Sequence, residues 1–119
     1  MSWFLVKIVY RIICGEGKHT PQFDEQLRLV EASDEESAFS IATELGRQGE
    51  DRFFNQSNQL VQWHFVNVSE LFRIEALQNG VELYSRIEEK ENGELYTALV
   101  HSKAEHLQLN HALGYLQSI

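Results

Sequence analysis

The chain of 119 residues is 43% hydrophobic and carries 18 acidic and 10 basic side chains, which give a formal charge of -8. This composition is typical of a globular protein and excludes a disordered or fibrous one. Because a nucleic-acid binder needs a clustered basic surface, we expect no nucleic-acid partner. The length predicts a single domain over residues 1–119, since two cores would each be too small.

The sequence lacks the marks of a membrane or secreted protein. It contains no run of about 18 apolar residues, as a membrane span requires. Its N-terminal segment has neither the basic region nor the cleavage site of a signal peptide. The one cysteine, Cys14, excludes an internal disulfide and suits a reducing compartment. We therefore expect a cytoplasmic protein with no membrane partner.

The first two elements are predicted to be the strands of a β-hairpin. Residues 3–14 are rich in valine, isoleucine and aromatic residues, and residues 22–32 alternate in polarity. Both patterns are typical of strands in a sheet. The glycines and the proline of residues 15–21 predict the turn that joins them.

Glu25 is the unusual residue of the second predicted strand. Its parity places it with the apolar side chains Phe23, Leu27 and Leu29, which are expected to face the core. A carboxylate in a core needs a partner or a raised pKa. We expect Glu25 either to be turned outward by a bulge or to lie as a paired acid in a pocket.

A helix is predicted to begin at Ser33. Ser33 and Glu36 form a capping-box pattern, in which each side chain satisfies an amide of the first turn. Apolar residues then recur at helical spacing and predict one stripe facing a core. Gly46 and Gly49 mark the expected end of the helix.

The second half of the chain predicts two further strands and a second helix. Residues 60–68 read as a third strand, with Val61, Trp63 and Phe65 in the core under the first helix. Residues 69–77 fit either an extension of that strand or a short helical turn. After an Asn-Gly turn, residues 81–89 predict a fourth strand.

A C-terminal helical segment over about residues 94–119 completes the predicted elements, with its helix running from Glu94 to about His111. The resulting order is β-β-α-β-β-α. This order predicts an α+β fold with a four-stranded antiparallel sheet and two helices on one side.

Three local patterns resemble parts of catalytic or metal-binding motifs. Gly15-Glu16-Gly17 lacks the third glycine and the following helix of a dinucleotide site, so we interpret it as a hairpin turn. Cys14 lies at the end of an apolar strand face, where a small buried hydrophobe is expected. The polar residues near the C-terminus with metal-ligating side chains are His101, Glu105, His106 and His111.

Only His101 and Glu105 in that cluster have the i, i+4 spacing of a helical zinc site, and no second cysteine is present. We interpret the cluster as a polar helix face. The sequence therefore predicts no catalytic residue, no metal and no cofactor, and the interpretation leans away from an enzyme.

Strand parity predicts one polar sheet face. If the four strands form one sheet, polar side chains from every strand gather on its outer face. They include Asp24, Gln26, Gln62 and Glu82 besides six candidates for ligand binding: Lys7, Arg11, Arg28, His64, Tyr84 and Arg86. Such a face could bind an anionic small molecule or a peptide, form a dimer contact, or remain solvated.

Five segments of the chain resemble a known family. They are residues 3–9 (Trp-Phe-Leu-Val-Lys-Ile-Val), 23–29 (Phe-Asp-Glu-Gln-Leu-Arg-Leu), 35–39, 61–68 and 82–87. Together these segments resemble the bacterial domain of unknown function 4288 family over roughly residues 1–90. The resemblance implies a small bacterial protein and brings no activity, cofactor or catalytic residue.

These observations favour a non-enzymatic binding or protein-interaction module. The alternative is a small-molecule-binding protein or a modest enzyme that uses the polar sheet face. We expect a homodimer, because the first strand is largely apolar on both faces and one side of the sheet lacks a cover. A second apolar stripe over Leu109, Leu113, Leu116 and Ile119 supports this. The competing account folds the tail back across its own sheet and leaves a monomer.

Overall fold

The structure is a computed structural model that describes the backbone of residues 1–118 and the side chains of residues 1–111. The chain divides into two compact units, Met1–Ser85 and Arg86–Ile119, and each is described by itself. The single domain over residues 1–119 stays a prediction. No helix in the described part of the chain is long and apolar enough to cross a membrane.

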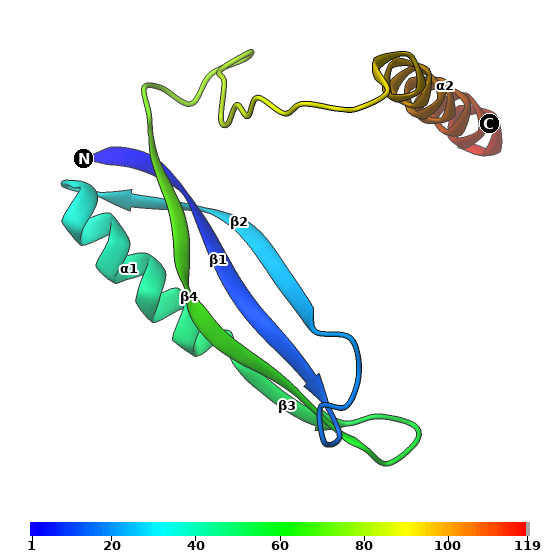
Figure 1. Cartoon of the computed structure of the whole chain (residues 1–119). Coiled ribbons are helices and arrows are strands. Elements are labelled where there is room, and N and C mark those ends of the chain that lie inside the picture. Colours follow the sequence, from blue (N-terminus) through cyan, green and yellow to red (C-terminus); the bar gives the residue numbers. More distant parts are fainter. Residues whose placement is uncertain (119) are drawn as a thin grey trace. The chain divides into compact units, whose positions relative to one another are not determined.

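The first unit is a four-stranded antiparallel sheet with one helix against it (Figure 1). Its strands lie in the order β2-β1-β4-β3. In chain order the elements of the whole protein are β1 (Ser2–Cys14), β2 (Gln22–Ala32), α1 (Glu35–Gln48), β3 (Asp51–Phe54), β4 (Leu60–Ile74) and α2 (Gly93–Ser118). The predicted α+β fold with the order β-β-α-β-β-α is confirmed.

The third and fourth strands are not the two that the sequence pattern predicted. The predicted third strand is β4, and it continues through residues 69–74. β3 was not predicted, and residues 81–89 do not form a strand. β3 pairs instead with the first residues of β4 across the short turn of residues 55–59. A segment of alternating polarity forms a strand only where a neighbouring strand offers it hydrogen bonds.

The core lies between the sheet and α1. Phe4, Val6, Ile8 and Tyr10 of β1 point to this side and are almost completely buried. We call this side of the sheet the helix face. The helix brings Ala38 and Ala42, whose small side chains let it approach closely. Val61, Trp63 and Phe65 lie on the same face, as predicted, with Val61 buried and the two aromatic rings half-buried against the core.

The register of β2 reverses the predicted assignment of its two faces. Leu29 lies opposite Leu5, and Arg28 lies opposite Val6. Directly opposed residues share a face, so Arg28 is on the helix face and Leu29 is on the other, which we call the open face. The apolar set Phe23, Leu27 and Leu29 is therefore exposed rather than in the core.

Glu25 lies opposite Val9 on the open face and is exposed. Neither of the two predictions for Glu25, a bulge or a paired acid in a pocket, is correct. The pairing of β1 with β2 runs without a register shift, so no bulge turns this side chain outward. Its exposure follows from the register, since α1 packs on the opposite side of the sheet.

The cap of α1 is Asp34 and not Ser33. The Ser37 amide donates to Asp34 Oδ1 at 2.7 Å, whereas Ser33 Oγ reaches only the Ser37 hydroxyl at 3.4 Å. A carboxylate that accepts an amide at a helix N-terminus is stabilised in its charged form. The hydrogen bond from the Ser37 amide accordingly lowers the pKa of Asp34. At the other end the helix closes at Gly49, whose amide donates to the Leu45 carbonyl.

Tyr10 fastens the last turn of α1 to the sheet. Its side chain is buried, and its hydroxyl donates to the Gly46 carbonyl at 2.8 Å. Burial raises the pKa of Tyr10 above its ordinary value, and the charge of Arg28 opposes that shift. The phenol therefore stays protonated in the folded protein at a pH where it ionises in the unfolded chain.

Tyr10→Phe is expected to lower the free energy of unfolding by about 1 kcal/mol at neutral pH, the usual net value of one hydrogen bond. As the pH rises above the ordinary tyrosine pKa of about 10, the unfolded wild type ionises first and the wild type loses stability. The advantage of the wild type over the variant should then shrink. Urea unfolding between pH 8 and 11 measures this, with Tyr96→Phe as an exposed control; a constant difference would contradict the assignment.

The second unit contains α2, which extends beyond the predicted end near His111. The Leu95 amide donates to the Asn92 side chain at 2.9 Å, so Asn92 caps the helix. Every described side chain from Glu94 to His111 is exposed, including Leu109. The other members of the predicted apolar stripe, Leu113, Leu116 and Ile119, lie outside the described side chains.

Candidate functional site

The six predicted ligand-binding residues do not share one face. Lys7, Arg11 and His64 lie on the open face, because Arg11 is opposite His64 and four residues, an even number, from Lys7. Tyr84 comes to the same face from the segment that follows β4, where its ring lies 5.9 Å from Lys7 Nζ. Arg28 is on the helix face. Arg86 belongs to the second unit, where it pairs with Glu88 at 2.7 Å.

Lys7 is the centre of a small charged cluster on the open face. Its Nζ lies 3.3 Å from Glu70 Oε2, and both side chains are partly buried. The Tyr84 ring also packs edge-on against Phe72, with 5.4 Å between ring centroids. These contacts hold residues 81–84 against the sheet and neutralise the Lys7 charge. Sequence parity missed Glu70, because the register shift between Lys7 and Ile8 decides which β4 residue faces Lys7.

The other two basic residues of this face also have partners. Arg11 lies over the Phe23 ring at 5.7 Å. His64 contacts Gln62 Oε1 at 2.8 Å and lies 3.9 Å from the Glu50 carboxylate. Each charge is thus engaged by its own neighbour, and the three do not converge on one point as the groups of an anion site would.

The open face also carries four exposed apolar side chains. Phe23 is 53% exposed, Leu27 54%, Leu29 43% and Phe72 41%. Three of these lie at alternate or near-alternate positions of β2, the edge strand of the sheet. Scattered exposed leucines are ordinary, but several exposed apolar side chains on one sheet face are typical of an interaction surface.

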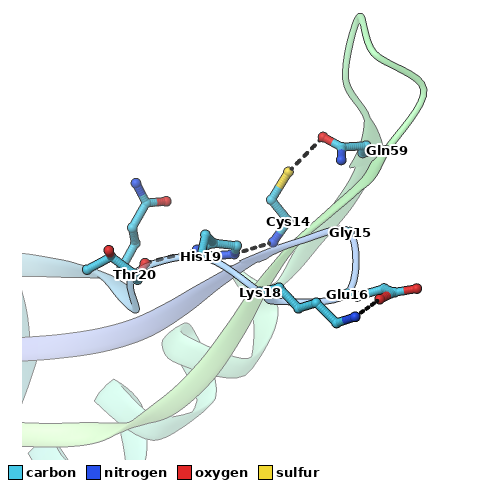
Figure 2. Close-up of a pocket in the computed structure, with 8 residues that line it drawn as sticks. Cys14, Gly15, Glu16, Lys18, His19, Thr20 and Gln59 are labelled. Carbon is cyan, nitrogen blue, oxygen red and sulfur yellow. Dashed lines mark hydrogen bonds and ion pairs between the residues drawn. The ribbon is translucent and has the colours of Figure 1, made fainter.

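A cleft of about 910 Å³ opens where the β1–β2 turn meets the β3–β4 turn (Figure 2). Gly15 and Gly17 in this turn have φ angles of 59° and 77°, a left-handed conformation that glycine adopts without strain. The interpretation of Gly15-Glu16-Gly17 as a hairpin turn is confirmed. The residues that line the cleft are Cys14, Gly15, Glu16, Lys18, His19, Thr20, Gln22 and Gln59.

His19 in this cleft is held by two hydrogen bonds to the backbone. The Cys14 amide donates to Nε2 at 3.0 Å, and Nδ1 lies 2.9 Å from the Thr20 carbonyl. An acceptor at Nε2 and a donor at Nδ1 define the neutral tautomer with its proton on Nδ1. His19 therefore organises the turn and is not placed to take a proton from the thiol.

The Cys14 thiol faces amide side chains. Its Sγ lies 3.4 Å from Gln59 Oε1 and 3.6 Å from Asn55 Nδ2. Neither is a base, and Cys14 is half-buried rather than fully buried as predicted. Activation of a thiol needs a base or a positive charge beside it. The contacts of Cys14 therefore tie the two turns together.

The described residues contain no group of three or more histidine, cysteine or acidic side chains that could hold a metal ion. His101, Glu105, His106 and His111 lie on the exposed surface of α2. His106 Nδ1 contacts the Ser102 carbonyl of its own helix at 3.0 Å.

These features define a small α+β protein whose antiparallel sheet has one face covered by a helix and an open face that carries both charged and exposed apolar side chains. A family model described as a domain of unknown function (DUF4288) matches residues 3–85. The chain belongs to this family. The family description assigns no activity, and no curated protein and no solved structure matches the chain.

Proposed function

We propose that this chain is a cytoplasmic, bacterial protein-interaction module without enzymatic activity, which assembles as a homodimer. The observation that carries the proposal is the apolar group on the open face, Phe23, Leu27, Leu29 and Phe72, each more than two-fifths exposed. Covering such side chains removes apolar surface from water, which stabilises an assembly by about 25 cal/mol per Å².

The residues around this group support an interaction surface more than a ligand site. The basic side chains Lys7, Arg11 and His64 are each engaged by a neighbour on the protein. The alternative function, small-molecule binding or modest catalysis at the polar sheet face, would use Lys7, Arg11, His64 and Tyr84. It would have to displace the ion pair between Lys7 and Glu70 first.

The formal charge of -8 on each chain opposes association. At physiological ionic strength the Debye length is about 8 Å, so this repulsion is largely screened for charges on opposite sides of a dimer. A stable homodimer therefore depends on the local contacts at the interface rather than on the net charge.

Light scattering of the wild type at micromolar concentration is expected to give twice the chain mass of 13.8 kDa. Leu29→Glu should dissociate the dimer, because it places a charge in the apolar group of the open face. Ile41→Glu on the exposed side of α1 is the matched control and should leave the dimer intact. A wild type of 13.8 kDa would contradict the homodimer, and a dimer unaffected by Leu29→Glu would contradict the open face as its interface.

A further inference from the structure

β2 is a long edge strand of the sheet that contains neither a proline nor a bulge. It has 11 residues, pairs with β1 on one side only, and runs in unbroken register. The chain's one proline, Pro21, precedes the strand, so every residue of β2 keeps its amide. Exposed edges of this kind offer unpaired N–H and C=O groups to another strand, and proteins commonly block them with a proline, a bulge or a covering segment.

The opposite edge of the sheet differs from β2 in this respect. β3 has only four residues. Beyond the end of β3, β4 has no strand on its outer side. There the Phe65 amide donates to the Glu50 carboxylate at 3.0 Å. The Glu50 carboxylate thus accepts a hydrogen bond that a neighbouring strand would otherwise accept. The rest of β4 to Ile74 also has no strand on this side, but its ladder with β1 shifts register twice, whereas β2 runs in unbroken register and is the more regular edge for pairing.

The helix-face side chains of β2 form a row with an acid, an amide and a base. Gln26 Nε2 donates to Asp24 Oδ2 at 2.8 Å, and Arg28 Nη2 donates to Gln26 Oε1 at 2.8 Å. In an antiparallel copy of β2 this row runs in the opposite direction, so the base of one copy faces the acid of the other. A second β2 strand laid antiparallel with Gln26 opposite Gln26 therefore places Asp24 opposite Arg28 of the second copy, twice in each dimer.

The open-face side chains agree with the same register. With Gln26 at the centre, Phe23 lies opposite Leu29 of the second copy, again twice. Glu25 lies opposite Leu27, so no two like charges oppose one another between positions 22 and 30. Opposite charges directly across two strands stabilise a sheet, and each Phe23–Leu29 pair removes apolar surface from water.

We propose that two copies of this chain pair their β2 strands antiparallel, centred on Gln26, so that the two sheets join across a two-fold axis. The inference rests on the proposed homodimer and specifies its interface. Such a pairing satisfies the free backbone groups of both edges and makes one contact surface that is the same in each copy, as two-fold symmetry requires.

The test is a pair of single charge reversals, Arg28→Asp and Asp24→Arg. In either variant alone, like charges oppose each other twice across the proposed interface, and the dimer should weaken by at least about tenfold. In an equimolar mixture the two variants restore two opposite-charge pairs, so a heterodimer should form in preference to either homodimer. Native mass spectrometry separates the three species by mass.

Two controls keep the test decisive. Arg52→Asp on β3 makes the same charge change at the other edge and should leave the dimer unchanged. Gln26→Cys on a Cys14→Ser background should form an intermolecular disulfide, because directly opposite residues bring their Cα atoms to about 4.5–5.5 Å. This second measurement does not depend on the Trp63 Nε1 hydrogen bond to Asp24, which Asp24→Arg removes.

The outcomes separate this inference from the proposed function. A monomeric wild type would overturn both. A dimeric wild type whose charge-reversed variants still self-associate, show no preference for the heterodimer and form no disulfide at position 26 would overturn the β2 pairing alone. A dimer lost on deletion of residues 108–119 but not on charge reversal would place the interface on α2 instead.

Discussion

Phe4→Ala is expected to lower the free energy of unfolding by about 3–5 kcal/mol, the cost of removing a large aromatic ring from a core. Phe4 is only 1% exposed and belongs to the buried cluster between β1 and α1. The cluster rests on small partners such as Ala38 and Ala42, which cannot extend into the space that the ring leaves. Much of the cavity should therefore remain.

Urea unfolding followed by tryptophan fluorescence measures this loss, and Phe54→Ala is the matched control. Phe54 is 67% exposed at the edge strand β3, so its truncation should change stability by less than about 0.5–1 kcal/mol. Since small domains are stable by only about 5–15 kcal/mol, Phe4→Ala brings this chain close to unfolding. Equal losses in the two variants would contradict the described core.

Gly46→Ala is expected to be the second strongly destabilising change, although alanine favours helices. A methyl group at Gly46 would overlap the ring of Phe65, which packs against the last turn of α1. Forcing a ring or a helix to move in a packed core costs about 1–3 kcal/mol. The gain in helix propensity is about 1 kcal/mol, so the net effect should be a loss of stability.

A double-mutant cycle with Phe65→Leu tests the cause of that loss. The smaller side chain makes room for the methyl group, so Gly46→Ala should cost much less in the Phe65→Leu background. Gly93→Ala is the control, because nothing lies within 4 Å of its added methyl group. If Gly46→Ala lost the same stability in both backgrounds, the cause would be the helix and not the contact with Phe65.

Sequence patterns alone determined most of the elements of the first unit. The apolar run of β1, the alternation of β2 and the Gly-containing turn between them are local features, and each predicted its element within a residue or two. The same holds for the apolar stripe of α1 and for the aromatic residues Trp63 and Phe65 of β4. These patterns depend on the periods of strand and helix, which are properties of the chain itself.

The face of each strand was decided by tertiary structure. Alternation shows that Phe23, Leu27 and Leu29 share a side, but the pairing of Leu5 with Leu29 decides that this side is open. A shift of one residue would have put the same side chains under α1. Arg28 was separated from the other predicted ligand-binding residues for the same reason, because it lies opposite Val6 and not on the side of Lys7.

The sequence by itself thus determined which residues form the hairpin and the first helix and where the long strand begins, and it identified the family. Only the tertiary structure decided that β3 rather than residues 81–89 completes the sheet, and that Asp34 rather than Ser33 caps α1. In both cases the local pattern favours a residue or a segment that the folded chain does not use in that role. The pairing with β4 decides the strand, and the oxygen that reaches the Ser37 amide decides the cap. These contacts exist only in the folded chain.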